Sequence, residues 1–214
     1  MQSITSDYLL AADAALELIG HVEVMQRWEE PSALEQMTVG ALATHLGSQV
    51  LSVHAAMTTG QGVTAQKPVS LLEHYDLVAW VRADLDDEAN VTIRDRAAAG
   101  ARDGHGALVA SVQGALGDLR TAFAKAELPP GIRNPSWEWA LSFEDFLVTR
   151  MMEIVVHADD LAVSVDVVPQ ELSELVIGPV LALLVGISMS RHGQAAVVRT
   201  LSRRERAPGS ISAF

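Results

Sequence analysis

The amino-acid sequence predicts an all-α fold, a bundle of about four long helices with an additional helix or short extended segments. Apolar residues recur at helical spacing along most of the chain, and Gly, Pro and polar residues separate the periodic segments at ordinary loop lengths. Hydrophobic residues make up 49% of the 214 residues, which is enough for a globular core. Because nothing repeats internally and no linker divides the chain, we expect one domain over residues 1–214.

The first two helices are predicted from apolar periodicity and from residues that start or stop helices. A Leu-, Ala- and Glu-rich segment predicts a first helix over residues 4–28, before Pro31. Thr38 is a suitable N-cap for a second helix that ends at the turn formed by Gly60 and Gly62. The apolar face of this second helix consists of Val39, Leu42, Leu46, Val50, Val53 and Met57.

The middle of the chain predicts two more helices. Ser70 is a suitable N-cap for a helix over residues 71–87, and Asn90 is expected to break the pattern. An alanine-rich helix then follows over residues 91–126. Glycine inside a helix costs about 1 kcal/mol relative to Ala, so we expect a kink, a break or close packing at three positions. These are Gly100, Gly104 and Gly106.

The last third begins where Leu128-Pro-Pro-Gly131 stops the alanine-rich helix. The alternation of Trp137, Trp139, Leu141 and Phe143 predicts a short extended piece. An apolar helix follows and ends before Pro169, and a final helix is expected from Glu171 to about Thr200.

Charge and composition exclude several classes of function. A net charge of −12 argues against nucleic-acid binding, which needs an excess of Lys and Arg to neutralise phosphates. No apolar run approaches the roughly 18 uncharged residues of a membrane span, and the N-terminus lacks the features of a signal peptide. We therefore expect a cytoplasmic protein with no membrane partner. Since cysteine is absent, any thiol chemistry must use an external thiol.

The apolar helix before Pro169 carries a ladder of ionisable residues in the stretch RMMEIVVHADDLAVSVD, residues 150–166. At about 100° per residue, Arg150 and His157 fall on its apolar face, and Glu153 and Asp160 lie at the edge of that face. The middle of the face is formed by Phe143, Leu147, Ile154 and Leu161. A charge on an inward face costs several kcal/mol unless it is paired or binds a metal, so these residues indicate a site.

The spacing of Glu153 and His157 suits two ligands of one cation, because residues four apart share a helix face. Zinc and other first-row divalent ions accept carboxylate oxygen and imidazole nitrogen, and a catalytic site keeps three protein ligands and one open position. Among seven histidines, His45 lies in the most apolar context and is the candidate third ligand. His54 is the fallback. Nickel and iron suit the same donors.

Residues near these candidates allow supporting roles and simpler interpretations. Thr44, Gln49 and Asp160 are suitable hydrogen-bond partners for the second nitrogen of a ligand histidine. The alternative to a metal site is an ordinary helical pair of Glu153 and His157. In that case, Arg150 pairs with Glu153 or Glu144, and Asp159 and Asp160 form a solvated face.

Three segments resemble segments of a known family. The segment WEEPSALEQMTVGALATHL, residues 28–46, resembles the start of the second helix in the DinB-like superfamily. More closely, it is similar to the N-terminal domain of mycothiol-dependent maleylpyruvate isomerase. RMMEIVVHADDL resembles that family's R-x-x-E-x-x-x-H-x-x-D-L helix, and the segment over residues 199–214 resembles the closing segment of actinobacterial members. The resemblance implies a four-helix bundle in which His45, Glu153 and His157 hold zinc, with mycothiol as cosubstrate.

The resemblance also implies a chemistry, in which zinc lowers the pKa of mycothiol and the thiolate attacks an electrophilic substrate. Arg150 is the candidate catalytic residue, able to orient a substrate carboxylate bidentately. The isomerase carries a further C-terminal domain, whereas this chain ends at Phe214, so we expect a mycothiol S-transferase. A maleylpyruvate-type isomerase and a non-catalytic bundle that binds a metal or a small ligand are the alternatives.

A basic cluster near the C-terminus stands out in this acidic chain: Arg199, Arg203, Arg204 and Arg206. We interpret it as a solvated helix end that complements the helix dipole. The alternative is a patch that receives the carboxylate of an anionic substrate or contacts a neighbouring subunit in a homodimer.

Overall fold

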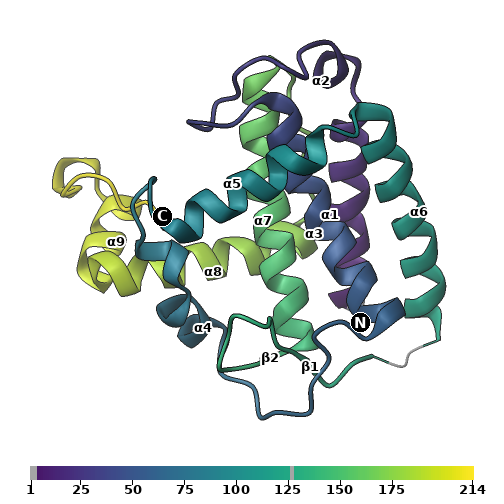
Figure 1. The fold of residues 1–214 in the computed structure, drawn as a ribbon. Coiled ribbons are helices and arrows are strands. Elements are labelled where there is room, and N and C mark those ends of the chain that lie inside the picture. The colour runs from purple at the N-terminus through teal and green to yellow at the C-terminus, as the bar shows by residue number, and fades with distance from the viewer. Residues whose placement is uncertain (1–3, 126–127) are drawn as a thin grey trace.

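The computed structural model describes residues 4–125 and 128–214, and most of these residues are helical (Figure 1). The elements are α1 (Ile4–Ile19), α2 (Val22–Gln26), α3 (Val39–Thr59), α4 (Leu71–Leu77), η1 (Ala79–Arg82), α5 (Glu88–Ala101), α6 (His105–Ala124), β1 (Gly131–Ile132), β2 (Leu141–Ser142), α7 (Phe143–Ser164), α8 (Glu174–His192), α9 (Gln194–Ser202) and η2 (Arg204–Arg206). The two short strands pair antiparallel, with Gly131 opposite Ser142. The predicted all-α class is confirmed.

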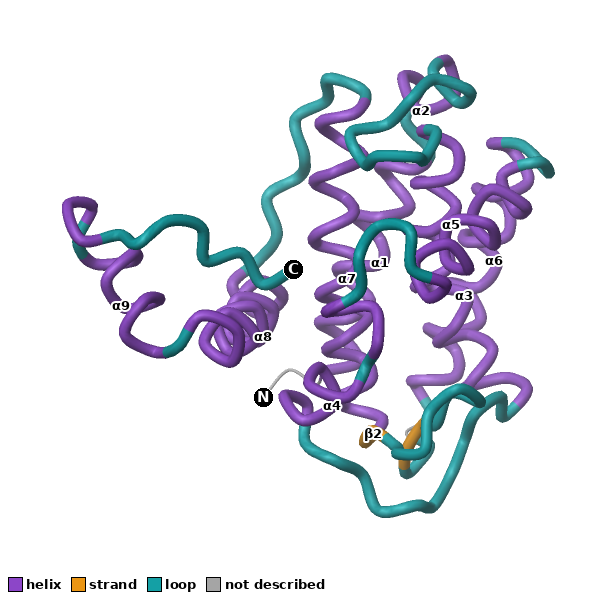
Figure 2. The backbone as a smooth tube through the Cα atoms, turned by 60° about the vertical axis from the view of Figure 1, so that its left-hand side comes forward, coloured by secondary structure: helices purple, strands orange, loops and turns teal. Residues whose placement is uncertain are grey.

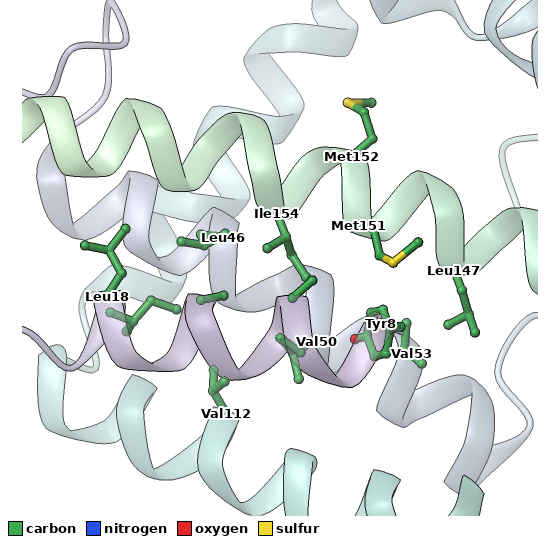
Figure 3. Close-up of a cluster of buried hydrophobic side chains, with 14 of the residues drawn as sticks. Tyr8, Leu18, Leu46, Val50, Val53, Val112, Leu147, Met151, Met152 and Ile154 are labelled. Atoms are coloured by element: carbon green, nitrogen blue, oxygen red, sulfur yellow. The ribbon is translucent and has the colours of Figure 1, made fainter. Parts of the chain in front are cut away.

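Four long helices form the bundle: α1, α3, α6 and α7 pack against one another around the core (Figures 1 and 2). Helix α5 packs on α3, whereas α8 packs on α7 and carries α9 at its far end. Figure 3 shows Leu147, Met151 and Ile154 pointing from α7 toward α1, which contributes Tyr8 to the same cluster. The predicted apolar face of α7 is thus buried in the bundle.

The predicted helix starts at Thr38 and Ser70 are confirmed by their hydrogen bonds. The Thr38 hydroxyl accepts a hydrogen bond from the N–H of Ala41 at 3.1 Å, and the Ser70 hydroxyl accepts one from Glu73 at 3.3 Å. Each satisfies a backbone donor that has no partner inside its helix. Helix α3 ends at Thr59, and its C-cap Gly60 adopts a φ of 70°, which favours glycine.

The prediction of a single first helix over residues 4–28 is wrong, because this segment contains two helices. Helix α1 stops at Ile19, and His21 starts α2 by accepting a hydrogen bond from the N–H of Glu23 on its Nδ1 atom, at 3.2 Å. Apolar periodicity continues across this break, whereas the cap at His21 is a local interaction that periodicity does not report.

The prediction for the middle of the chain is partly wrong. The helix expected over residues 71–87 ends at Leu77 and is followed by the short η1. Asn90 does not break a helix: it lies in the first turn of α5, where its side-chain amide donates to the Asp84 carbonyl at 3.0 Å. That bond makes Asn90 part of the helix start.

The break expected in the alanine-rich helix is present. Helix α5 ends at Ala101 and α6 begins after Gly104, which has a φ of 85°. Close packing is found at Gly100, where an added Cβ atom would lie 2.8 Å from the methyl group of Thr44. The predicted last residue of this helix, 126, lies outside the described residues.

The C-terminal third differs from prediction at two points. Only Leu141 and Ser142 of the predicted extended piece form a strand. The strand ends there because Ser142 caps α7 by accepting a hydrogen bond from the N–H of Asp145 at 3.0 Å. The final predicted helix is two helices, α8 and α9, separated at Gly193, whose φ is 82°. A positive φ ends one helix without steric cost only at glycine.

Helix α8 qualifies the expectation that no segment has the length and composition of a membrane span. It meets both criteria over Glu174–His192, with 33% of its apolar window buried. Its inner face includes Val176, Val180, Leu183 and Ile187, and it packs against α7, α4 and α1. Most of the apolar window is not buried by this contact.

Candidate metal centre

Helices α3 and α7 bring together the three residues that the sequence predicts as ligands. The Nε2 atoms of His45 and His157 lie 3.8 Å and 3.2 Å from Oε2 of Glu153. One nitrogen or oxygen donor from each residue lies within 4.8 Å of the others. All three side chains are mostly buried, with exposed fractions of 17%, 12% and 18% for His45, Glu153 and His157.

The positions of these donors follow from helix packing. Glu153 and His157 lie one turn apart on α7, and buried Ile154 and Leu161 anchor that helix in the core. His45 lies between residues of α3 that are buried against α7 and α6. Since both helices are held by their apolar faces, the three donors do not depend on a loop for their placement.

Asp160 orients one of the imidazoles. Nδ1 of His157 lies 3.0 Å from Oδ2 of Asp160, one turn further along α7. When Nδ1 carries a proton and donates it in a hydrogen bond to this carboxylate, the lone pair of Nε2 faces the candidate ligand atoms of His45 and Glu153. The ring of His45 meets that of His157 edge-on, with centroids 4.6 Å apart.

The electrostatics of the cluster favour a positive charge between its side chains. Burial raises the pKa of Glu153, but hydrogen bonds with His157 and His45 and the charge of Arg150 outweigh it and hold that pKa well below its usual range. Burial lowers the pKa of His157, whereas hydrogen bonds with Asp160 and Glu153 raise it, and the result is about 9. The carboxylate of Glu153 is therefore ionised, and its negative charge favours a cation bound between the three side chains.

This donor set fits a divalent metal ion. Two imidazole nitrogens and one carboxylate oxygen are ligands that zinc, nickel and iron all accept, and three protein ligands leave a position open for another molecule. A metal here competes with the proton on Nε2 of His157, so binding releases a proton.

Arg150 lies beside the cluster but does not neutralise it through an ion pair. Its Nη1 donates to Oε1 of Gln49 at 2.5 Å, and its Nε donates to the Thr149 hydroxyl at 3.2 Å. Its guanidinium carbon is 5.4 Å from the ring centroid of Phe146. Within the described residues, no ion pair joins Arg150 to Glu153 or Glu144, so neutral groups hold the cation.

Three other sequence expectations have different outcomes. The Thr44 hydroxyl donates back to the Gly40 carbonyl at 2.8 Å, and the Gln49 amide donates to the backbone carbonyl of His45 at 3.0 Å. Neither side chain is bonded to an imidazole, so that part of the prediction is wrong for both. The fallback histidine, His54, faces Asp118 of α6 at 2.9 Å, outside the cluster.

A group of aromatic side chains around His74 was missed by the sequence prediction. Buried His74 of α4 accepts a hydrogen bond on Nδ1 from Nε1 of Trp139 at 3.0 Å, and the ring of Trp137 contacts the same imidazole. Burial and the charge of Arg150 lower the pKa of His74 to about 4, although Glu153 raises it. The sequence signal that could have indicated this group was the adjacent pair His74 and Tyr75, which follows the N-cap Ser70 in the same helix.

Comparison with protein families gives a match over residues 9–162 to the mycothiol maleylpyruvate isomerase N-terminal domain. The chain belongs to this family. The domain match includes α7 almost to its end, and all three candidate ligands lie within it. Comparisons with curated proteins and with solved structures give no match.

The C-terminal arginines lie beyond the part of the chain that matches the mycothiol maleylpyruvate isomerase N-terminal domain. Arg199 is in the last turn of α9, and the other three are in or next to η2. All four are exposed, and α9 packs on α8 rather than on α7 (Figure 1). Arg199 has the position that the helix-dipole interpretation requires.

Proposed function

We propose that this chain is a zinc-dependent enzyme that transfers mycothiol to an electrophilic substrate. The observation that carries the proposal is the cluster of His45, Glu153 and His157, whose donors lie within 4.8 Å in a mostly buried site. The family and the lack of cysteine support an external thiol as cosubstrate. The proposal includes a cytoplasmic location, with neither membrane nor nucleic acid as partner.

The chain's own residues have distinct tasks in this proposal. A bound zinc ion lowers the pKa of a thiol at its open position. Asp160 keeps His157 in the tautomer that offers Nε2, and Glu153 supplies negative charge. Arg150 provides a cation to orient a carboxylate of the electrophile. The thiol loses its proton, and the thiolate sulfur then bonds to an electrophilic carbon while that carbon's π bond, or its bond to a leaving group, breaks and takes the electron pair.

A second candidate is an isomerase of the maleylpyruvate type, which the description of the matching family favours. The two reactions share the addition of sulfur to carbon. If the adduct is released, the result is S-transfer; if rotation and loss of the thiol follow, the result is cis–trans isomerisation. A bundle that binds a metal or a small ligand without catalysis is the third candidate.

Metal analysis of His157→Ala tests the metal centre. Purified full-length protein is loaded with zinc, desalted and analysed by mass spectrometry, and we expect about one equivalent in the wild type and less than a tenth of that in the variant. Asp159→Ala is the matched control, because Asp159 is the exposed neighbour of Asp160 and should retain zinc. A wild type without divalent metal, or a variant with undiminished metal, would contradict the proposed centre.

Consumption of mycothiol separates the enzyme from the binding protein. The zinc-loaded wild type should consume mycothiol with an electrophile such as monobromobimane faster than the His157→Ala protein does. With maleylpyruvate, thiol that is regenerated supports the isomerase. Equal rates for wild type and variant with varied electrophiles favour the non-catalytic protein.

A further inference from the structure

Helix α8 presents an apolar face to solvent on the side away from the bundle. From Leu175 to Met189 the sequence contains no charged residue, and the one polar side chain, Ser188, is buried. The solvent side of about four turns is therefore apolar, with exposed fractions of 46% for Leu175, 52% for Leu181 and 38% for Met189. A contiguous exposed apolar surface of this kind indicates an interaction site.

The spacing of residues on this outer face is that of a helix that packs on another helix. Five residues, which we call the α8 seam, follow one another at alternating intervals of three and four positions: Leu175, Gly178, Ala182, Val185 and Met189. This alternation keeps one stripe of a helix directed at a partner helix. The small Gly178 and Ala182 are both exposed, so a partner can approach the helix closely at the middle of the seam.

The α8 seam is complementary to itself in an antiparallel arrangement. Ala182 is its midpoint, with Leu175 seven residues before it and Met189 seven residues after it. When two copies of α8 pack antiparallel about a two-fold axis at Ala182, Leu175 of one copy lies opposite Met189 of the other. A two-fold dimer requires the same surface on both subunits, and this pattern meets that requirement.

The charges at the two ends of α8 favour the same arrangement. Glu171 and Glu174 are exposed at its start, whereas the basic cluster of Arg199, Arg203, Arg204 and Arg206 is exposed beyond its end, where α9 packs on α8 (Figure 1). Antiparallel packing brings the acidic start of one copy toward the basic end of the other, and parallel packing brings like charges together. An anionic lipid surface would attract the arginines but repel the acidic start and the net charge of −12.

We propose that the α8 seam is the interface of a homodimer, in which a second copy of this chain packs its own α8 antiparallel about a two-fold axis near Ala182. The family match ends at residue 162, before α8 begins, so the interface belongs to the part of the chain beyond the matched domain. The candidate metal ligands lie on α3 and α7, and the inference does not depend on the proposed function.

Sedimentation equilibrium of the full-length protein tests the dimer. The wild type should have twice the chain mass of 22.9 kDa. Ala182→Glu places two like charges opposite each other across the two-fold axis, so we expect it to raise the dimer dissociation constant about a hundredfold. Ala110→Glu is the matched control, because Ala110 is exposed on α6 and the same charge there should leave the dimer intact. A monomeric wild type, or an Ala182→Glu dimer as tight as that of the wild type, would overturn the proposal.

Engineered cysteines test the antiparallel direction and do not require the Ala182→Glu protein to fold. Because the chain has no cysteine, each disulfide formed on mild oxidation reports on the introduced residues alone. Ala182→Cys should link to itself. Leu175→Cys should not, since its two copies would lie about 21 Å apart along the helices, well beyond the reach of a disulfide. An equal mixture of Leu175→Cys and Met189→Cys should link, and self-linked Leu175→Cys without linkage in the mixture would contradict the arrangement.

Vesicles of phosphatidylserine and phosphatidylcholine separate the dimer from a lipid surface. The dimeric wild type should stay in solution when the vesicles are sedimented. A wild type that is monomeric and sediments with the vesicles would assign the apolar face of α8 to a membrane surface and overturn the proposal.

Discussion

At the scale of single residues, the site depends on how Glu153 keeps its charge at 12% exposure. A buried carboxylate is costly unless hydrogen bonds and opposite charges offset its desolvation. Here His157 and His45 approach the same carboxylate oxygen, and Arg150 adds positive charge without pairing. This leaves the carboxylate ionised and available to a metal ion.

His74 gives a pH-dependent prediction at the residue scale. Its pKa of about 4 lies below the ordinary value of 6.5, so the folded state favours the neutral imidazole. Stability from His74 is complete above pH 6.5 and is lost as pH falls toward 4, because the unfolded state takes up the proton first. The expected loss is about 3 kcal/mol in the free energy of unfolding.

Urea unfolding of the wild type and His74→Asn between pH 7.5 and 4 measures this loss. An Asn side chain retains an oxygen to accept the N–H of Trp139, so the variant controls for that hydrogen bond. Tyr75, Trp137, Arg150 and Glu153 surround or act on His74 in both proteins. The wild-type curve should fall more steeply with acid, and parallel curves would contradict the shift.

At the scale of elements, contacts of Trp28 hold the start of α3 in place. The indole of Trp28 covers Gly40 in the first turn of α3 and donates from Nε1 to the Ala101 carbonyl of α5 at 3.1 Å. One side chain thus joins the segment after α2 to α3 and to α5. The position of α3 in turn decides where His45 lies.

Gly40→Ala tests this contact. The added Cβ atom would lie 2.5 Å from the Trp28 ring, which is buried and hydrogen-bonded to Ala101, so the helix or the indole must move. We expect a loss of about 1–3 kcal/mol in the free energy of unfolding. Gly114→Ala in α6 is the control: it meets no atom within 4 Å and should stabilise by about 0.5–1 kcal/mol. Equal effects in denaturant unfolding would contradict the role of the Trp28 contact.

The elements also show what the sequence could predict. Thr38, Ser70 and the apolar face of α7 were predictable because each depends on residues close in the chain. The breaks near Gly20 and Gly193 were not, since apolar spacing continues through them and local caps and a positive φ decide the ends. A strong apolar pattern therefore predicts that a helix is present but does not predict the residue at which it ends.

The parts of the candidate site that depend on local sequence were also predictable. The spacing of Glu153 and His157 pointed to one helix face, and the apolar context of His45 selected it over His54. The hydrogen bond from Trp139 to His74 was beyond reach, because it arises from the packing of α4, which no local pattern encodes. The same holds for the Gln49 contact of Arg150, which joins residues 101 positions apart.

At the scale of the whole molecule, the four-helix bundle matches the family, and the helices that follow it lie outside the match. The four bundle helices lie within or extend little beyond the residues that match the family, and they carry the candidate ligands. Helices α8 and α9 follow that match, and α8 packs on α7. The C-terminal segment runs from α9 back toward the bundle (Figure 2). There the ring of Phe214 lies 6.3 Å from that of Tyr75 and 5.0 Å from that of Trp80. The C-terminal segment therefore packs against aromatic side chains of α4 and η1.

The central claim is that His45, Glu153 and His157 hold a zinc ion that binds an external thiol. X-ray absorption at the zinc edge of the full-length protein tests it most directly, before and after mycothiol is added. The account predicts only nitrogen and oxygen neighbours at about 2.0–2.1 Å without thiol, and one added sulfur at about 2.3 Å with it. A zinc shell that gains no sulfur, or that is unchanged in His157→Ala protein, would contradict the account.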